Sequence, residues 1–335
     1  MGKIRAGITA GDINGVGLEI ILKSFRGHDL FELCTPIVYA DIDVMHYHME
    51  TLHMGDVSLN TINSEDEAKD AVINVFSNWS DVADFDLGKD RPSGGKFAFE
   101  SLQRASSAIE SKLIDLMITA PLNKNNVGHF GFTGHTGFLA DKFGHDALMI
   151  MVSKAVKVAL VTGHIPISEV ASELTEERVF NQIKAFNQSL IGDFGIKEPA
   201  IAVLGLNPHA GDGGLIGKED LEVIAPAIAK AKEDKINAKG PFSADGFFGS
   251  KAYLRYDGVL AMYHDQGLIP FKSISFETGV NFTAGLSIVR TSPGHGVAYD
   301  IAGQGLASST SFEEAVRLAC EVYARRVGQG ATYNW

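Results

Sequence analysis

Cysteine is nearly absent from this sequence. Cys34 and Cys320 are the only two cysteines among 335 residues, and almost the whole chain separates them. That number excludes a disulfide framework, and it excludes a zinc site built from cysteine ligands. Structural disulfides belong to oxidising compartments, so we expect this protein in the reducing cytoplasm.

Long apolar runs and an excess of basic charge are also missing. No apolar stretch approaches the roughly 18 residues that a membrane helix needs, and residues 1–6 do not resemble a secretory signal. The 29 basic residues are outnumbered by 41 acidic ones, which gives a net charge of −12. We therefore expect neither nucleic acid nor a membrane as a partner, since both attract basic surfaces.

Neither of the common phosphate-binding loops is present. Residues 11–17 (GDINGVG) are rich in glycine, but their spacing is not the G-x-G-x-x-G of dinucleotide-binding proteins. A tight turn before a helix explains this segment as well as an anion site does. Residues 213–218 (GGLIGK) approach a P-loop, yet Asp212 replaces its first glycine and Glu219 replaces its Ser/Thr. We therefore reject a P-loop.

What the sequence does contain is an alternation of short apolar runs and helical patterns. Strands buried on both faces and separated by helices indicate an α/β fold with a largely parallel sheet. The length predicts one large or two medium domains. We predict strands over 4–9, 36–40, 114–119, 156–161, 200–206 and 259–262, and helices over 17–25, 95–113, 221–232 and 312–326.

Three histidines each stand just past one of these strands: His164, His209 and His264. The carboxyl ends of parallel strands converge, and ligands collect there. A single histidine in such a position is more often a hydrogen-bonded loop residue than a metal ligand. Three at equivalent strand ends match the ligand set of a catalytic divalent metal ion, which keeps one position open. The sequence leaves both interpretations open.

Two cations, Lys272 and Arg290, lie in otherwise apolar stretches. A charge in such a stretch needs a partner, and a bound phosphate or carboxylate would serve, especially for the planar guanidinium group. The alternative is a solvated surface charge. Residues 295–303 are predicted to form a loop followed by a helix N-terminus, whose free N–H groups suit an anion.

Seven segments together resemble the 4-hydroxythreonine-4-phosphate dehydrogenase family of vitamin B6 biosynthesis. They follow one another in order over nearly the whole chain, which is far more specific than any single motif. The first departs from the usual GDPAGIGPE, since Ile13 and Asn14 replace Pro-Ala and Leu18 replaces the second Pro. The segments are GDINGVGLEI (11–20), TAPLNK (119–124), FTGHTGFLAD (132–141), ALVTGHIPIS (159–168), GLNPHAGDGGLIGKED (205–220), LAMYHDQGLIPFK (260–272) and GVNFTAGLSIVRTSPGHGVAYDIAG (279–303).

The resemblance implies the two-domain α/β fold of the isocitrate and isopropylmalate dehydrogenases, with mostly parallel sheets and a cleft between domains. Residues 1–132 plus 285–335 would form the first domain, on the cofactor side. Residues 133–284 would form the second, with the metal ligands and the dimer interface. The resemblance also implies a homodimer whose active site lies at the subunit interface.

The resemblance assigns roles to residues that match the family's motifs. One divalent ion is expected per site, zinc, magnesium or cobalt, together with NAD or NADP. The general acid or base stays open among Lys272, Asp245 and Asp265. The implied metal ligands are His164, His209 and His264; the substrate-binding residues are His135, Thr136, Lys272, Asn281 and Arg290; and the cofactor segment, similar to an adenosine-binding loop, includes His295, Gly296 and Asp300.

The implied reaction is the oxidation and decarboxylation of 4-phosphohydroxy-L-threonine to 3-amino-2-oxopropyl phosphate, in pyridoxal phosphate biosynthesis. The metal ion would act as a Lewis acid on the substrate hydroxyl, and the nicotinamide would accept hydride. One alternative is a dehydrogenase for a related phosphorylated four-carbon sugar acid, a threonate or erythronate 4-phosphate. Others are an acyl- or phosphoryl-transferase on a related scaffold, and a catalytically silent protein that binds a metabolite.

Overall fold

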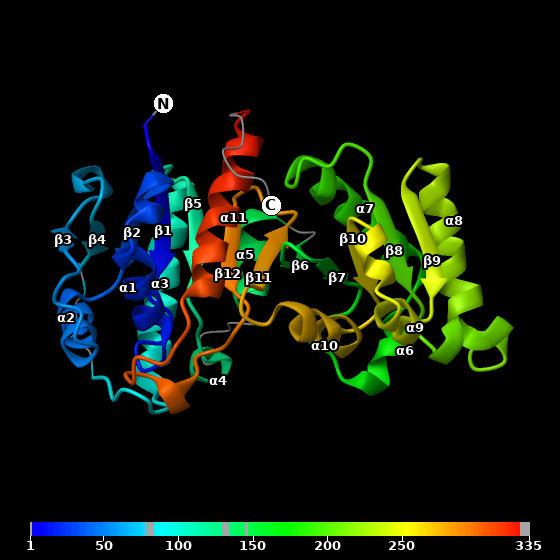
Figure 1. Cartoon of the computed structure of the whole chain (residues 1–335), viewed down its shortest axis with the longest axis horizontal. Helices are drawn as coiled ribbons and strands as arrows, with labels where there is room; N and C mark the ends of the chain where they lie inside the picture. Colours follow the sequence, from blue (N-terminus) through cyan, green and yellow to red (C-terminus); the bar gives the residue numbers. More distant parts are fainter. Residues whose placement is uncertain (1, 78, 80–83, 129–133, 145–146, 329–335) are drawn as a thin grey trace. The chain divides into compact units, whose positions relative to one another are not determined.

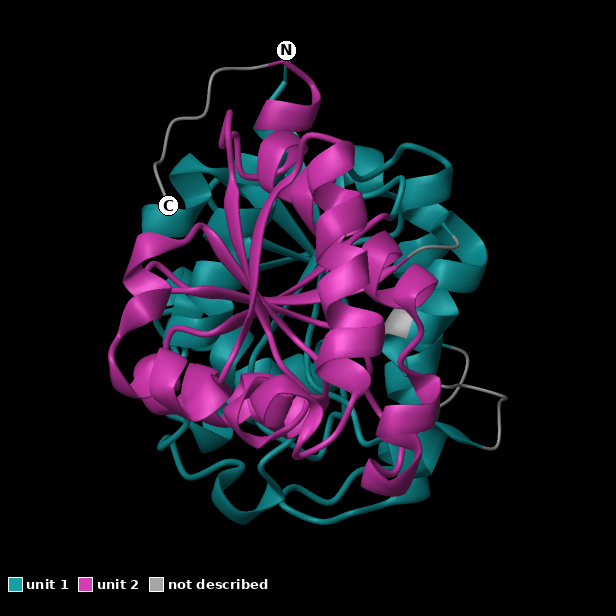
Figure 2. Cartoon of the chain, turned by 90° about the vertical axis from the view of Figure 1, so that its right-hand side faces the viewer, with its two compact units in different colours: residues 1–145, 286–324, 331–333 teal, residues 146–285, 325–330, 334–335 magenta. Residues whose placement is uncertain are grey.

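The computed structural model describes residues 2–77, 79, 84–128, 134–144 and 147–328 (Figure 1). The chain divides into two compact units (Figure 2). Unit 1 contains the described residues up to 144 together with residues 286–324, and unit 2 contains residues 147–285 and 325–328. Each unit combines helices with mostly parallel strands, so the predicted α/β fold class is confirmed.

The strands of unit 1 follow the order β3-β4-β2-β1-β5-β12, and every neighbouring pair is parallel. β2 is buried along its whole length, as expected of a strand covered on both faces. The strands are β1 (Ile4–Thr9), β2 (Cys34–Tyr39), β3 (Leu59–Ile62), β4 (Ile73–Phe76), β5 (Leu116–Thr119) and β12 (Arg290–Pro293).

The helices of unit 1 form where apolar side chains recur at helical spacing. The first buries Leu18, Ile21, Leu22 and Phe25 but also one acid, Glu19. The predicted helices 17–25, 95–113 and 312–326 are confirmed to within a few residues. The helices are α1 (Gly17–Arg26), α2 (Ile42–Thr51), α3 (Pro92–Glu110), α4 (Lys124–Val127), α5 (His135–Phe143) and α11 (Thr310–Arg326), whose last two residues belong to unit 2.

In unit 2 the strand order is β11-β6-β7-β10-β8-β9. β6 is antiparallel to both of its neighbours, and the other pairs are parallel. The strands are β6 (Leu148–Val152), β7 (Lys157–Leu160), β8 (Ala200–Leu204), β9 (Asn237–Phe242), β10 (Gly258–Ala261) and β11 (Val280–Ala284), and the helices are α6 (Val170–Glu173), α7 (Glu176–Gly192), α8 (Ala225–Glu233), α9 (Ala244–Gly249) and α10 (His264–Ser275).

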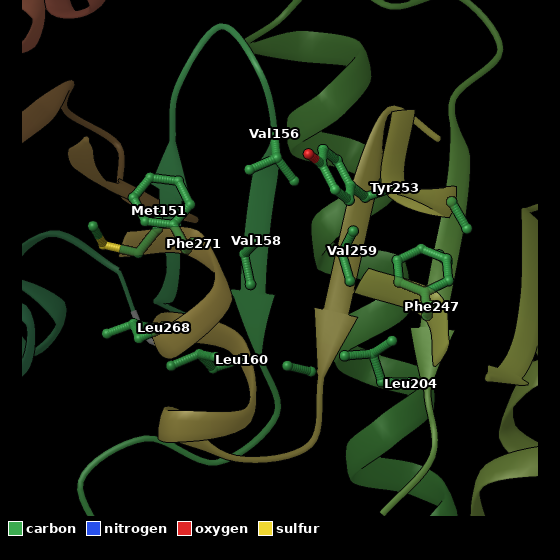
Figure 3. Packing of buried hydrophobic residues seen from close by; sticks show 13 residues of the cluster. Met151, Val156, Val158, Leu160, Leu204, Phe247, Tyr253, Val259, Leu268 and Phe271 are labelled. Carbon is green, nitrogen blue, oxygen red and sulfur yellow. The ribbon is translucent and has the colours of Figure 1, made fainter. Parts of the chain in front are cut away.

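The core of unit 2 forms where α10 packs on β7 and β10 (Figure 3). Leu268 and Phe271 of the helix lie against the strand residues Val158 and Leu160. Gly267 permits this close approach, because a Cβ atom there would lie only 2.8 Å from Cδ2 of Leu160. The helix that begins with His264 is thereby fixed against the sheet.

All six predicted strands are present, with ends that differ by up to two residues. The predicted helix 221–232 begins as a π-helical turn over Asp220–Ile224 and continues as α8. β3, β4, β6 and β11 were not predicted; in β3, β4 and β11 polar side chains interrupt the apolar run. β9 and β12 escaped prediction because they contain proline and basic residues, which obscure the alternation typical of a strand.

The division between units differs from the sequence-based one at α5 and at residues 325–328, which lie in unit 2 although we placed 285–335 in the first domain. We placed residues from 133 onward in the second domain, whereas α5 belongs to unit 1. The rings of Phe138 and Phe99 of α3 pack edge to face, with centroids 5.7 Å apart. The backbone N–H of Ser287 donates to Phe143 O. These contacts join α5 to α3 and to the chain that enters β12.

The two cysteines meet inside unit 1 despite their separation in sequence. Both are free and buried. A hydrogen bond with Cys34, together with burial, raises the pKa of the Cys320 thiol well above its ordinary value. In the part of the chain that the structure describes, no helix combines the length and the apolar character needed to cross a bilayer.

Phe271→Ala should lower the free energy of unfolding by about 3–5 kcal/mol, because it removes a fully buried ring from the unit 2 core. Urea unfolding followed by circular dichroism measures the change. The matched control is Phe276→Ala at the end of the same helix, where the ring is 69% exposed and the expected change is at most about 0.5 kcal/mol. Equal effects of the two substitutions would contradict the packing described.

Candidate active site

Two of the three histidines face each other in unit 2. His164 follows β7 and His264 is the first residue of α10; their ring centroids are 5.4 Å apart with the planes at 44°. Both line a cavity of about 510 Å³, whose walls also include Tyr263 and Asp265. This volume is typical of a small-molecule site.

Asp265 orients His264. Its Oδ1 atom lies 2.7 Å from Nδ1 of the imidazole. A carboxylate on one ring nitrogen leaves the other, Nε2, available as a ligand, and metal-binding histidines are commonly held in this way. The side chain of Asp265 is 69% exposed.

His209 lies in an unusual turn after β8. From His209 to Gly213 every residue has positive φ, with 55° at His209, 51° at Ala210 and 45° at Asp212. This left-handed backbone is unfavourable for residues other than glycine. It must be held by contacts elsewhere, and a buried carboxylate provides them.

That carboxylate is Asp220, which is 2% exposed. Its Oδ1 accepts from Leu206 N at 2.8 Å, and its Oδ2 accepts from the backbone N and side-chain Nδ2 of Asn207 at 3.1 and 2.8 Å. Glu219 accepts a second bond from the same amide group. Asp220 thus fixes the two residues that lead from β8 into the turn of His209.

Two further side chains connect the ends of the strands that precede the histidines. The Thr162 hydroxyl donates to Met262 O at 2.7 Å. Gln266 accepts from Met262 N at 2.7 Å and donates to Gly205 O at 2.6 Å. The ends of β7, β10 and β8 are therefore joined by side-chain hydrogen bonds, which set the spacing of the loops that carry the histidines.

The three histidines are the residues that would hold a divalent metal ion. Three imidazoles are suitable ligands, and His164 and His264 converge. Within the described ranges, however, no three His, Cys, Asp or Glu side chains are grouped closely enough to hold an ion. The structure thus brings two of the predicted ligands together and places His209 on the neighbouring strand end.

The three candidates for general acid or base lie in unit 2. The Ser243 hydroxyl, the Gly246 backbone N–H and the nearby His209 hold the pKa of Asp245 below its usual value, so this carboxylate is ionised at neutral pH. Lys272 is exposed in the last turn of α10.

Asn281, predicted to bind substrate, lies on β11 and has a buried Oδ1 for which no described residue provides a hydrogen bond.

Unit 1 contains a separate cluster around Arg290, which is 1% exposed at the start of β12. Its Nη2 and Nε donate to Thr119 Oγ1 at 2.6 and 3.1 Å. Burial lowers the pKa of Arg290 to about 9. Burial and the positive charges of Arg290 and Lys124 hold the pKa of His135 well below 6.5. These groups make a positively charged site in an acidic protein.

Lys124, which lies near His135, was not among the predicted site residues, although the TAPLNK segment that contains it was recognised. Its position five residues after the end of β5, as the first residue of α4, is the signal that could have added it. The backbone of Thr136 lies in α5, but its side chain is outside the described residues.

The predicted cofactor residues lie on the loop after β12. His295 is partly buried, and burial lowers its pKa; Gly296 and Asp300 are exposed. A short 3-10 turn over Tyr299–Ile301 replaces the predicted helix N-terminus. The Tyr299 hydroxyl donates to Asp12 Oδ2 at 2.7 Å, which connects this loop to the first glycine-rich segment.

Asp220→Ala should lower the free energy of unfolding by about 3 kcal/mol, because it leaves two backbone donors without their charged acceptor and removes one of the two acceptors of the Asn207 amide. It should also shift the imidazole NMR signals of His209 more than those of His164. Glu222→Ala, at a position with a 61% exposed side chain, is the control and should change neither quantity. An Asp220→Ala protein with wild-type stability and spectra would refute the anchoring role.

Comparison with known proteins agrees with these features. The sequence matches the family described as "Pyridoxal phosphate biosynthetic protein PdxA" over residues 32–319. A protein of Bacteroides thetaiotaomicron named 4-hydroxythreonine-4-phosphate dehydrogenase is 47% identical over 328 residues, which are 97% of this chain and 90% of the relative. A protein of Halalkalibacterium halodurans with the provisional name D-threonate 4-phosphate dehydrogenase is 35% identical over 320 residues, 94% of this chain and 96% of the relative.

Solved structures agree as well. The crystal structure of 4-hydroxythreonine-4-phosphate dehydrogenase from Klebsiella pneumoniae superposes with a TM-score of 0.82 at 34% identity and covers 96% of this chain and 98% of its own. The resemblance found in the sequence is thereby confirmed. The chain belongs to the family of the pyridoxal phosphate biosynthetic protein PdxA.

Proposed function

We propose that this protein is a dehydrogenase that oxidises and decarboxylates 4-phosphohydroxy-L-threonine to 3-amino-2-oxopropyl phosphate, with NAD or NADP as the hydride acceptor. The observation that carries the proposal is the buried Arg290 beside His135 and Lys124. A guanidinium and an ammonium group placed together form a local positive site in a protein with net charge −12, and such a site suits a phosphate or carboxylate. The relative that is 47% identical bears the name of this activity.

Arg290, Lys124 and His135 would bind an anionic group of the substrate. The guanidinium is fixed by Thr119 and can offer a planar, bidentate contact to phosphate or carboxylate. His135 is neutral at pH 7 because its pKa is depressed. In the proposal it donates one hydrogen bond to the anion, while the positive charge comes from Arg290 and Lys124. Thr136 completes this set in the proposal.

In unit 2, His164, His209 and His264 would hold one divalent ion. When bound, the ion supplies Lewis acidity toward the substrate hydroxyl and toward the carbonyl formed from it. Asp265 holds the His264 ring, and the hydrogen-bonded strand ends fix the loops of the other two ligands. The ion in the proposal is zinc, magnesium or cobalt; three imidazole ligands favour zinc or cobalt, because magnesium prefers oxygen ligands.

Proton transfer requires a side chain that changes its protonation state near the substrate. Asp245 is ionised and close enough to His209 for its charge to be affected. Asp265 is engaged with His264, which favours an orienting role. Lys272 is exposed and could bind a substrate anion or transfer a proton, and Asn281 is a further substrate-binding residue in the proposal.

A related substrate is the second candidate, because the relative from Halalkalibacterium halodurans bears the name of a threonate 4-phosphate enzyme. Such a sugar acid phosphate has the same two anionic ends and a hydroxyl in place of the amine. The higher identity to the named 4-hydroxythreonine-4-phosphate dehydrogenase favours the amino acid phosphate.

We also propose a homodimer with its active site at the subunit interface, and a cytoplasmic location, where the buried thiols stay reduced.

Purified protein should form NADH or NADPH from 4-phosphohydroxy-L-threonine, measured by absorbance, and D-threonate 4-phosphate should be the poorer substrate. Prior chelation should abolish turnover, and Zn²⁺, Mg²⁺ or Co²⁺ should restore it, because neutral histidines bind metal ions reversibly. Full activity after chelation would contradict the metal proposal. Absence of reduced cofactor with either substrate, together with transfer of acyl or phosphoryl groups, would contradict the dehydrogenase proposal.

The affinity for the phosphorylated substrate should fall above about pH 9. The free protein carries Arg290 with a pKa of about 9, and a bound anion raises this pKa, so protons bind more tightly in the complex. Affinity is therefore full below pH 9 and drops by about tenfold per pH unit above it. Isothermal titration calorimetry from pH 7 to about 10 measures this. Arg290→Ala should lose at least about tenfold in affinity and show no such pH dependence, whereas a flat wild-type profile would reject the role.

A further inference from the structure

The segment 295–307 carries the residues proposed to bind the cofactor, yet it has little regular structure of its own. Apart from the 3-10 turn over Tyr299–Ile301, it is a loop with several exposed residues. A loop of this kind holds one conformation only where other elements bind it. The hydrogen bonds from other elements to this segment therefore determine how far its ligand-binding conformation is formed before the ligand binds.

Two attachments come from the glycine-rich segment before α1. The backbone N–H of Val16 donates to Val297 O at 3.0 Å. The Tyr299 hydroxyl donates to Asp12 Oδ2 at 2.7 Å and accepts from Asn123 Nδ2 at 3.3 Å. Asp12 is fully buried, so this bond joins the loop to the interior of unit 1.

Two further attachments come from α1 itself. Glu19 is fully buried, and its carboxylate accepts from Gly303 N at 3.3 Å and from Ala307 N at 3.1 Å. One turn later, Lys23 donates to Glu19 at 2.7 Å, to Gly305 O at 2.8 Å and to Ala307 O at 2.7 Å. A buried carboxylate is tolerated because a cation and backbone donors satisfy it.

Formation of helix α1 does not require the bonds that Glu19 and Lys23 make to the loop. Glu19 and Lys23 bond to each other, and together they bind Gly303, Gly305 and Ala307 of the loop. The segment 11–20 lacks the spacing of a dinucleotide-binding loop. Its contacts are instead with the loop that resembles an adenosine-binding segment.

We propose that Glu19 and Lys23 are positioning residues, which hold segment 295–307 in the conformation that binds the dinucleotide cofactor. This inference rests on the proposed dehydrogenase function. If the loop were already rigid without them, their loss would cost only stability. If they preorganise it, their loss lowers cofactor affinity while the chemical step is preserved once the cofactor is bound.

The test uses Lys23→Met and Glu19→Gln, with Tyr299→Phe as a milder variant at a different attachment. Hydrogen exchange at the amides of Gly303 and Ala307, measured by NMR, should become faster by about tenfold or more, as loss of a charge-assisted hydrogen bond predicts. The KM for NAD should rise at least about fivefold, while kcat stays within about twofold.

Arg26→Gln is the matched control, since Arg26 lies on the same helix with a half-exposed side chain paired only with Asp56 among the described residues. It should leave the exchange rates of the loop and the KM unchanged. Unchanged exchange in Lys23→Met and Glu19→Gln, or a fall in kcat with constant KM, would overturn the inference. A wild-type protein that forms no reduced cofactor would contradict the proposed function instead, and the exchange rates would still decide whether these residues hold the loop.

Discussion

Parallel strands impose the constraint on which both units depend. Their backbone groups pair with neighbours, and their side chains are buried on both faces, so a strand interior offers little room for chemistry. Reactive groups must then occupy the residues just past the carboxyl ends. In unit 2 these are the residues after β7, β8 and β10, and in unit 1 Thr119 ends β5 beside Arg290. The distribution of polar residues follows from the direction of the strands.

That constraint also explains what could be predicted from sequence. The apolar runs of β7, β8 and β10 were recognisable because burial on both faces leaves them almost entirely apolar. The histidines could be recognised because each follows such a run. Their mutual geometry could not, since the distance from His209 to the other two depends on a left-handed turn and on Asp220, a residue 11 positions later. No periodicity encodes a turn of that kind.

Buried charge is the second theme that sequence patterns concealed. Arg290, Glu19 and Asp220 are each almost fully buried, and each is surrounded by donors or acceptors that a linear pattern does not reveal. Arg290 was identified because its neighbours in sequence are apolar. Glu19 was overlooked because an acid at the start of a helix is unremarkable in sequence, where it favours the helix dipole. Only its hydrogen-bond partners, nearly 290 residues later in the sequence, show that Glu19 binds the loop.

The left-handed turn that carries His209 has a consequence for how this sequence can change. At Ala210 and Asp212 a glycine would relieve backbone strain of about 1–2 kcal/mol per residue, so stability alone favours glycine there. The same holds at position 209, where the side chain is exposed and adds nothing to the core. A histidine at that position makes the folded state less stable than a glycine would. Because Ala210 and Asp212 share this strain, the cost belongs to the whole turn, and the hydrogen bonds of Asp220 to the residues that lead into the turn help to offset it.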